Sequence, residues 1–228
     1  MGVMRWSGQC LAVLLCGLAG FAHGETLRIG IEGEYPPFSR TDAKGRITGF
    51  DAEITTAVCR QLKANCKVVK QDWEKAIPDL NAGKIDALIS SMAITEERLR
   101  KVSFTRPYYN TPVRFVIHRN ATLQVDPPAR LAGHSVVVEA ESIYQAYAQA
   151  VLAPLGAKVV VVHGGMEAVW SLLASGKAES TLNDVVANAD FLKSPRGAAF
   201  IESGPAITDT RHMGVGAAIA VAKGNKAL

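Results

Sequence analysis

Two patterns of hydrophobic and polar residues alternate along the first half of the chain. Short, mostly apolar runs at 27–31, 68–69 and 85–89 predict buried strands. Apolar positions at helical spacing follow Asp51 and Asp72, and each of these aspartates is suited to begin a helix. Strand, helix, strand, helix, strand is the order of a parallel sheet covered by helices, so an α/β fold is predicted.

The same order begins again in the second half. An extended, β-branched stretch at 111–118 leads into a linker-like segment at Asp126-Pro127-Pro128. Strands are then predicted at 135–138, 158–162 and 179–182, and helices at 143–152 (ended by Pro154), at 166–175 and from Val185. We therefore expect a second α/β unit after a crossing near residue 111.

A ten-residue segment of the first half is echoed in the second. Residues 80–89 and 173–182 each hold a helix end, a glycine, a lysine and an acidic residue that opens a strand. Polar residues follow both copies, Ser90-Ser91 after the first and Asn183-Asp184 after the second. Ligands bind at the carboxyl ends of strands in open α/β sheets, so one cleft lined from both units is predicted. Chance similarity remains the alternative.

The N-terminal segment differs from the rest of the chain. Arg5 is its only charge, residues 10–21 are apolar, and small residues precede a cleavage point after Gly24. This pattern predicts a secretory signal peptide over 1–24, and a retained anchor is the alternative. Removing Arg5 lowers the formal charge from +4 to +3. Such a weak positive balance, without runs of Lys or Arg, gives no case for a nucleic-acid partner.

Export also decides how the cysteines are interpreted. Cys10 and Cys16 leave with the signal peptide, and Cys59 and Cys66 remain in an oxidising compartment. We predict a disulfide between Cys59 and Cys66 that closes the turn between a helix and the next strand. Two free thiols are the alternative, and a zinc site would need more ligands nearby.

The segment after the strand at 85–89 carries the strongest candidate chemistry. Ser90 and Ser91 end the apolar run, Thr95 is a suitable N-cap, and Arg98 follows within one helical turn. A guanidinium there can hold a carboxylate through two parallel hydrogen bonds. The alternative makes Arg98 a surface residue paired with a glutamate of the same turn.

These features together resemble the periplasmic solute-binding proteins of amino-acid ABC importers. The resemblance spans most of the chain after the signal peptide and is looser after about Pro127. The chain looks most similar to the lysine/arginine/ornithine binders and the histidine binders. The octopine and nopaline binders are also similar. The matching residues are Leu27-Arg28-Ile29-Gly30, Tyr35-Pro36-Pro37-Phe38, Gly49-Phe50-Asp51, Cys59 and Cys66, Ala76-Ile77-Pro78, Ile85-Asp86-Ala87, Ser90-Ser91-Met92, Ile94-Thr95-x-x-Arg98 and Phe104-Thr105.

The resemblance implies the type II periplasmic-binding-protein fold: two α/β lobes joined by two hinge strands, which close on one amino acid. We expect lobe 1 over 25–110, lobe 2 over 111–205 and a return strand to lobe 1 over 206–228. Relatives continue with helices that finish the first lobe, so the chain ending at Leu228 is expected to lack them.

The resemblance also implies a binding site. Arg98 would hold the ligand's α-carboxylate and Asp184 its α-ammonium, while Tyr35 and Trp73 would flank the side chain. Glu32 occupies the place where binders of cationic ligands carry an acidic residue. The full predicted set is Glu32, Tyr35, Trp73, Ser90, Ser91, Arg98, Ser142 and Asp184. An N-cap role for Asp184 and core packing for Trp73 are the alternatives.

Two further positions depart from the family pattern. Ala93 stands where many relatives have Ser or Thr, which removes one hydroxyl from the carboxylate site. Ala140-Glu141-Ser142 replaces the usual Gly-Thr/Ser-Thr loop, so only Ser142 clearly matches. Glu141 could meet a distal positive charge of the ligand, or it could be a solvated surface residue.

We expect a periplasmic monomer that binds a cationic amino acid or an opine and delivers it to the membrane subunits of an ABC importer. No cofactor or metal site is expected, because the histidines lack metal-ligand spacing and no phosphate-binding loop occurs. One rival is a cyclohexadienyl or arogenate dehydratase, with Glu32 or Glu141 as general acid. The other rival is the sensor domain of a membrane receptor.

Overall fold

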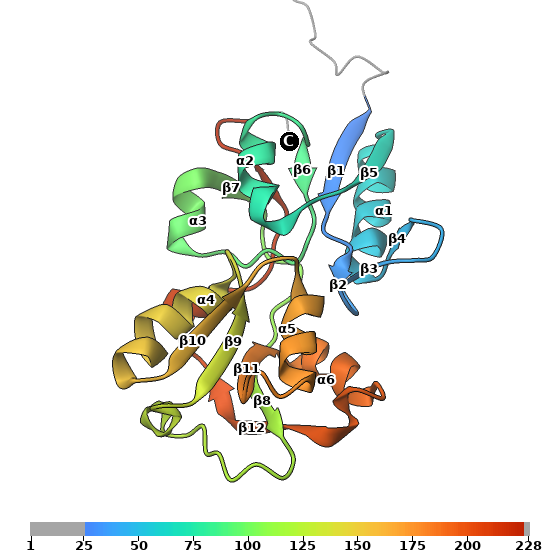
Figure 1. The fold of residues 1–228 in the computed structure, drawn as a ribbon. Coiled ribbons are helices and arrows are strands. Elements are labelled where there is room, and N and C mark those ends of the chain that lie inside the picture. Colours follow the sequence, from blue (N-terminus) through green and yellow to red (C-terminus); the bar gives the residue numbers. More distant parts are fainter. Residues whose placement is uncertain (1–25, 226–228) are drawn as a thin grey trace, which may run out of the picture.

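The structure is a computed structural model that describes residues 26–225, and it forms two lobes (Figure 1). The sheet of the first lobe has the strand order β5-β1-β6-β13-β7. Its strands are β1 (Leu27–Ile31), β5 (Cys66–Lys70), β6 (Ala87–Leu88), β7 (Val102–Phe104) and β13 (Ala220–Ala222). The pairs β1–β5 and β1–β6 are parallel, and β13 runs antiparallel to β6 and β7.

Helices cover both faces of this first sheet (Figure 1). They are α1 (Phe50–Leu62), α2 (Ala76–Asn81), which follows the 3-10 turn η1 (Trp73–Lys75), and α3 (Glu96–Lys101). Successive strand residues point to opposite faces. Ala87 therefore joins the core cluster that contains Cys59 of α1, and Leu88 joins the cluster that contains Leu80 of α2. Burial on both faces explains why this short strand is apolar throughout.

The second lobe repeats this arrangement with the strand order β10-β9-β11-β8-β12. Its strands are β8 (Val113–His118), β9 (Ser135–Glu139), β10 (Lys158–Val162), β11 (Ser180–Asp184) and β12 (Phe200–Ile207). The pairs β9–β10 and β9–β11 are parallel, and β8 runs antiparallel to β11 and β12. The predicted strands after residue 111 therefore form one sheet, to which the unpredicted β12 is added.

Helices again pack on both faces of the second sheet. They are α4 (Ile143–Tyr147) with the π-helical turn η3 (Ala148–Leu152) on one side, and α5 (Met166–Ala174) and α6 (Val185–Lys193) on the other. Val136 and Val138 face α4, while Val137 faces α5. Shorter elements are η2 (Pro128–Leu131), η4 (Ala153–Leu155), η5 (Gly197–Ala199), α7 (Thr210–Met213) and a small sheet of β2 (Glu34–Tyr35), β3 (Ser39–Thr41) and β4 (Ile47–Thr48).

The chain crosses between the lobes twice. It leaves the first sheet after β7, enters the second at β8, and returns after β12 to add β13 to the first sheet (Figure 1). The expected two-lobe α/β class is confirmed. The exact lobe boundaries at 110/111 and 205/206 stay predictions, and the signal peptide predicted over 1–24 lies outside the described residues.

The predicted disulfide is present. Cys59 at the end of α1 bonds to Cys66 at the start of β5, with seven positions separating the two residues in sequence. It joins the helix to the strand across the turn, as expected. Among residues 26–225, we find no helix long and apolar enough to cross a membrane.

Two local predictions are wrong. Asp51 is not the N-cap of α1: the helix begins at Phe50 after Gly49, which has φ 111°. A Cβ at Gly49 would lie 2.7 Å from the carbonyl oxygens of Pro37 and Phe38, so only glycine permits this entry. Asp51 is instead buried in the first turn, where it accepts hydrogen bonds from other side chains.

The second correction concerns the end of the helix predicted over 143–152. Pro154 does not end it, because the chain continues through the 3-10 turn η4 (Ala153–Leu155). Proline is tolerated near the start of such a turn, where its missing N–H is not required. Gly156, with φ 94°, ends the segment instead.

Candidate functional site

A cavity of about 370 Å³ lies between the two lobes. All eight residues predicted from the sequence line it: Glu32, Tyr35, Trp73, Ser90, Ser91, Arg98, Ser142 and Asp184. The structure therefore brings together side chains from both halves of the chain. Their roles toward a ligand remain a proposal, and their surroundings determine what each can do.

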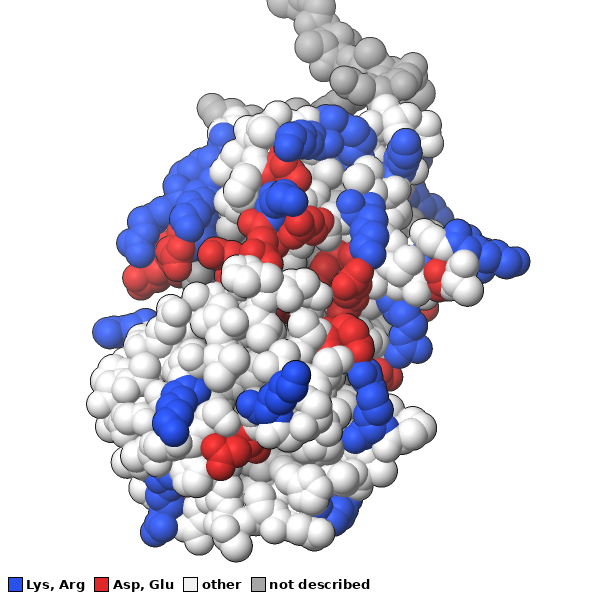
Figure 2. All heavy atoms as spheres, viewed as in Figure 1, with Lys and Arg blue, Asp and Glu red and all other residues white. Residues whose placement is uncertain are grey.

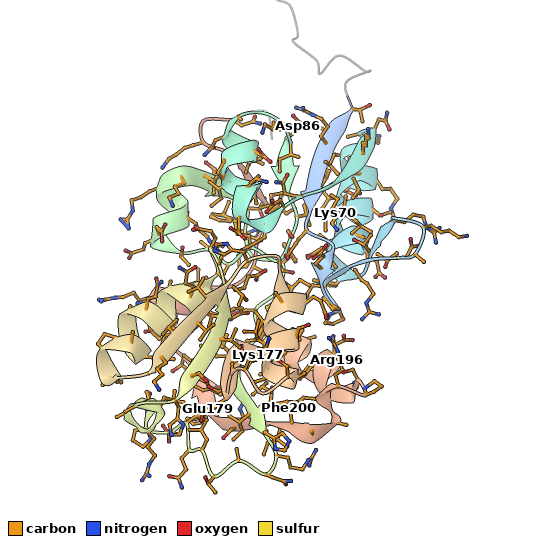
Figure 3. All side chains as sticks on the ribbon, viewed as in Figure 1. Lys70, Asp86, Lys177, Glu179, Arg196 and Phe200 are labelled. Atoms are coloured by element: carbon orange, nitrogen blue, oxygen red, sulfur yellow. A yellow bond between two sulfur atoms is a disulfide. The ribbon has the colours of Figure 1, made fainter. Side chains whose placement is uncertain are left out.

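The internal echo explains why these residues meet. Asp86 and Glu179, which open the echoed strands, lie at the far ends of the two lobes (Figure 3). Each is anchored there, Asp86 by Arg28 at 2.7 Å and Glu179 by the backbone N–H of Ser135 at 2.8 Å. Strands that start at the outer ends finish at the junction between the lobes. The polar residues after them consequently face one shared space.

Arg98 is held in place by its own helix and by the second lobe. The Thr95 hydroxyl caps α3 by accepting the Arg98 N–H at 3.2 Å. The guanidinium donates to the carbonyl of Ala93 at 3.2 Å and, across the junction, to the carbonyl of Glu141 at 3.0 Å. It also lies 5.2 Å from the centre of the Trp73 ring.

Arg98 is not the paired surface residue of the alternative interpretation. Its side chain is buried, and Glu97 of the same turn pairs with Lys101 at 2.6 Å instead. Within residues 26–225, Arg98 forms no ion pair with a carboxylate. Burial lowers the pKa of Arg98 to about 10, so it remains a cation at neutral pH. The cavity thus contains a buried positive charge that an anionic group could neutralise.

Glu32 places a buried carboxyl group in the same cavity. Its backbone N–H donates to the Ser90 hydroxyl at 3.0 Å, which fixes the chain where β1 ends. The carboxyl group is buried, and its Oε1 has no hydrogen-bond partner among the described residues. Burial first, and then the nearby carboxylate of Glu139, hold the pKa of Glu32 well above its usual range.

Glu139 is a site residue that sequence reasoning missed. It ends β9 in the second lobe, is as buried as Glu32, and likewise leaves its Oε1 without a hydrogen-bond partner within the described chain. Burial and then the charge of Glu74 raise the pKa of Glu139 to about 8, against the attraction of Arg98. Figure 2 shows acidic side chains gathered where the two lobes meet.

Asp184 caps a helix and also lines the cavity. Its Oδ1 caps α6 by accepting the Val186 N–H at 2.7 Å, and its Oδ2 accepts the Thr111 hydroxyl. The same side chain lines the cavity. Burial raises the pKa of Asp184 to about 6, and the hydrogen bonds from Val186 and Ala187 oppose that change. At neutral pH the carboxylate is therefore mostly ionised and can accept a further donor.

Aromatic side chains line the cavity from both lobes. The Tyr35 hydroxyl lies 3.0 Å from that of Tyr144 and donates to Asn183 Oδ1 at 2.9 Å. Trp73 packs partly against the core that contains Leu80, so its packing role is real, but it also lines the cavity. Tyr144 was not predicted, although it lies only two residues after Ser142, in the first turn of α4.

The three predicted serines differ in how much hydrogen-bonding capacity they keep. Ser91 donates its hydroxyl to Asp51 at 2.9 Å. Ser142 caps α4 by accepting the Gln145 N–H at 3.0 Å and donates to the carbonyl of Glu139 at 2.6 Å. Ser90 accepts from Glu32 and keeps its hydroxyl proton for another acceptor. Ser90 is thus the best placed of the three to donate to a ligand.

Glu141 lies outside the cavity. Its side chain is exposed and borders a neighbouring surface pocket, while its backbone carbonyl reaches Arg98. This position does not favour a contact between Glu141 and a distal positive charge of the ligand.

Further cavity-lining residues that sequence reasoning missed are Tyr109, Asn110, Thr111, Glu139 and Tyr144. In the described part of the chain, no cluster of three metal-ligating side chains occurs.

Comparison with known proteins gives consistent results. The family described as bacterial extracellular solute-binding proteins, family 3, matches residues 27–228. An L-arginine-binding protein of Pseudomonas aeruginosa is 43% identical over 219 residues, covering 96% of this chain and 84% of the relative. The lysine/arginine/ornithine-binding periplasmic protein of Escherichia coli is 34% identical, covering 92% of this chain and 82% of the relative.

Solved structures show the same fold. An ancestral arginine-binding protein bound to arginine has a TM-score of 0.79 and 29% identity, over 88% of this chain and 85% of that one. An ancestral amino-acid-binding protein described as a precursor of cyclohexadienyl dehydratase has a TM-score of 0.75 and 26% identity, over 87% and 82%. Fold and sequence agree, and this chain belongs to the bacterial extracellular solute-binding proteins of family 3.

Proposed function

We propose that this protein captures a cationic amino acid outside the cytoplasm and delivers it to the membrane subunits of an ABC importer. Arginine is the first candidate ligand, followed by lysine, ornithine, histidine and guanidino-bearing opines. The protein would act in the periplasm as a monomer after removal of residues 1–24. The names of its relatives, which include arginine-binding and lysine/arginine/ornithine-binding proteins, support this ligand class.

One observation carries the proposal. A buried guanidinium without a carboxylate partner (Arg98) and a buried carboxyl group without a hydrogen-bond donor (Glu32 Oε1) line the same cavity, within the described residues. Burying a charge without compensation is costly. A ligand with a carboxylate at one end and a cation at the other would compensate both groups at once.

The remaining residues fit the parts of such a ligand. Arg98 would bind the α-carboxylate with help from Ser90, and Asp184 would bind the α-ammonium. Tyr35 and Trp73 would lie along the side chain, whose distal cation would reach Glu32. Because Arg98 and Glu32 come from one lobe and Asp184 from the other, the ligand gains its full contacts only when the lobes meet.

A thermal-shift screen of the exported protein tests the proposal. A ligand that binds only the folded state raises the melting temperature by mass action. Arginine, lysine, ornithine, histidine, octopine and nopaline should be compared with glutamine, glutamate and leucine. Cationic ligands should give the largest shifts. A largest shift with glutamate, or none with any cationic compound, would reject the proposed ligand class.

A second candidate is an enzyme related to cyclohexadienyl or arogenate dehydratases. Its support is the raised pKa of Glu32, which would let this carboxyl group carry a proton for general acid catalysis, together with the fold shared with the dehydratase precursor. Glu141 is poorly placed for that role because it lies outside the cavity. A steady-state assay on arogenate and prephenate tests this candidate: turnover that Glu32→Gln removes would favour it over simple capture.

A further inference from the structure

Glu139 has a property that the proposed function does not use. It is a buried carboxyl group of the second lobe, it lines the cavity, and its Oε1 lacks a donor among residues 26–225. Glu32 has the same three properties in the first lobe. The charge of Glu139 raises the pKa of Glu32, so the two carboxyl groups interact within the cavity. The junction thus contains two such carboxyl groups, one from each lobe, in the lining of one cavity; they are called the carboxyl pair below.

The neighbouring acids differ from this pair because each has a partner. Glu34 pairs with Lys70 at 2.5 Å, and Asp72 with Lys75 at 2.9 Å. Glu74 bonds to His163 of the second lobe at 2.7 Å. Asp51 accepts hydrogen bonds from hydroxyl groups. Arg98, whose positive charge opposes the raised pKa of Glu139, donates its hydrogen bonds to backbone carbonyls. Only Glu32 and Glu139, of the acids named here, keep a buried oxygen without a donor.

We infer that Glu139 is a second anionic contact for the distal cation of the ligand, facing Glu32 from the other lobe, and that the pair selects a guanidinium over an ammonium. This inference rests on the proposed function. A guanidinium presents N–H donors along separate edges of one plane, so it can bond to two carboxylates at once. An ammonium is a compact point charge with no such fork. The pair would thus rank arginine above lysine.

The pair also predicts a proton linkage. Two buried carboxyl groups in contact do not both ionise readily, because like charges in a low-dielectric site repel each other. Glu34, Asp51, Asp72 and Glu74 add negative charge around the pair, and Arg98 adds positive charge. The N-terminus of α5 at Gly165 also lies next to Glu32. Without ligand the pair retains a proton, and a bound guanidinium lets both groups ionise and releases that proton to solvent.

Calorimetric titration of the exported protein at pH 7 tests the inference. The wild type and Glu139→Gln are titrated with arginine, lysine and citrulline, the neutral isostere of arginine. Glu139→Gln should lower the affinity for arginine by about tenfold or more and should lower that for lysine less, because a charge-assisted bond to the guanidinium is lost. The affinity for citrulline should change little.

Repeating the titrations in buffers of different ionisation enthalpy measures the proton. The wild type should release a proton on binding arginine, and Glu139→Gln should release markedly less. Glu139→Asp, which keeps the charge, should restore part of the arginine preference and of the proton release. Glu141→Gln, an exposed change two residues away, is the matched control and should behave as the wild type. Melting temperatures establish that each variant is folded.

The outcomes separate this inference from the proposed function. If the wild type binds arginine and Glu139→Gln keeps both its affinity and its arginine-to-lysine ratio, the inference is overturned and the proposed function stands. If the wild type binds no cationic amino acid, both are overturned. Loss of arginine affinity together with loss of proton release, while citrulline binding persists, supports the inference.

Discussion

The hydroxyl groups of Tyr35 and Tyr144 lie 3.0 Å apart and join the first lobe to the second. Tyr35 also donates to Asn183 at the end of β11, so one side chain of the first lobe bonds to two elements of the second. These bonds form at the edge of the cavity itself. A ligand that fills the cavity therefore binds next to hydrogen bonds that already join the two lobes. Its own contacts with both lobes add to these hydrogen bonds.

Tyr35→Phe should weaken ligand binding without unfolding the protein. The change keeps the aromatic ring and removes the hydrogen bonds to Tyr144 and Asn183, each worth about 0.5 to 1.5 kcal/mol. The two bonds together correspond to about 1 to 3 kcal/mol, so a loss of affinity of roughly five- to 150-fold is expected. Calorimetry measures it, with Tyr147→Phe, a change confined to the second lobe, as control. Equal affinities for the wild type and Tyr35→Phe would show that these bonds do not support closure on the ligand.

Arg98→Ala should abolish measurable amino-acid binding while the protein remains folded. The reason is that the α-carboxylate would lose the one Lys or Arg side chain that lines the cavity among the described residues. Truncating one member of a buried charge pair typically costs about 2 to 5 kcal/mol, or roughly 30-fold to several-thousand-fold in affinity. The matched control is Arg100→Ala, an exposed change on the same helix. Near-wild-type affinity in Arg98→Ala would contradict the assignment.

Glu32→Gln should reduce the affinity for arginine far more than that for glutamine. The substitution keeps the shape of the side chain but removes its negative charge, which matters only to a ligand with a distal cation. Competition binding of the two amino acids to the wild type and the variant measures the change in their ratio. Glu53→Gln on the exposed face of α1 serves as control. A parallel loss of both affinities would mean that Glu32 positions the site rather than recognising charge.

The titration of Asp51 should make the ligand-free protein less stable as the pH rises toward neutrality. Burial raises the pKa of Asp51 from 3.8 to about 7, so between these values the folded state retains a proton that the unfolded state has lost. Stability therefore falls through this window as pH rises, by up to about 1.4 kcal/mol for each unit of the difference. Asp51→Asn keeps an acceptor for the Tyr108 hydroxyl and removes the titration.

Thermal unfolding of both proteins between pH 5 and pH 8 measures this linkage. The melting temperature of Asp51→Asn, relative to that of the wild type, should increase with pH across the window. The other buried acids are present in both proteins, so the difference measures the titration of Asp51 together with its effect on the pKa of Glu32. A difference that stays constant over the whole range would contradict the raised pKa.

The sequence was sufficient to predict the fold and much of the site, because the relevant signals are local. Buried strands are apolar runs, and the residues that follow them face the cleft, so Ser90 and Asp184 could be found from strand ends alone. Arg98 could be found because Thr95 is a typical N-cap residue and predicts the start of the helix that carries Arg98. The resemblance to a family added the flanking roles of Tyr35 and Trp73, whose positions after strands do not by themselves specify an aromatic pocket.

What the sequence could not predict depends on distant packing. Glu139 is the last residue of a strand, and nothing near it in sequence reveals that Glu32 lies opposite. The burial of Asp51 follows from Gly49, whose tight approach to the carbonyls of Pro37 and Phe38 starts the helix two residues earlier than expected. Ser91 was predicted as a ligand contact, but its hydroxyl is directed to Asp51, forty residues earlier in the chain. These pairings exist only in three dimensions.

The most direct test of the central claim is a calorimetric comparison of arginine, glutamine and glutamate with the wild-type exported protein. These ligands share the α-carboxylate and α-ammonium and differ in the charge of the side chain, which is positive, neutral or negative. If Glu32 and Arg98 compensate opposite ends of the ligand, arginine should bind tightest, glutamine more weakly and glutamate weakest of the three. Glutamate binding as tightly as arginine, or tighter, would contradict the account.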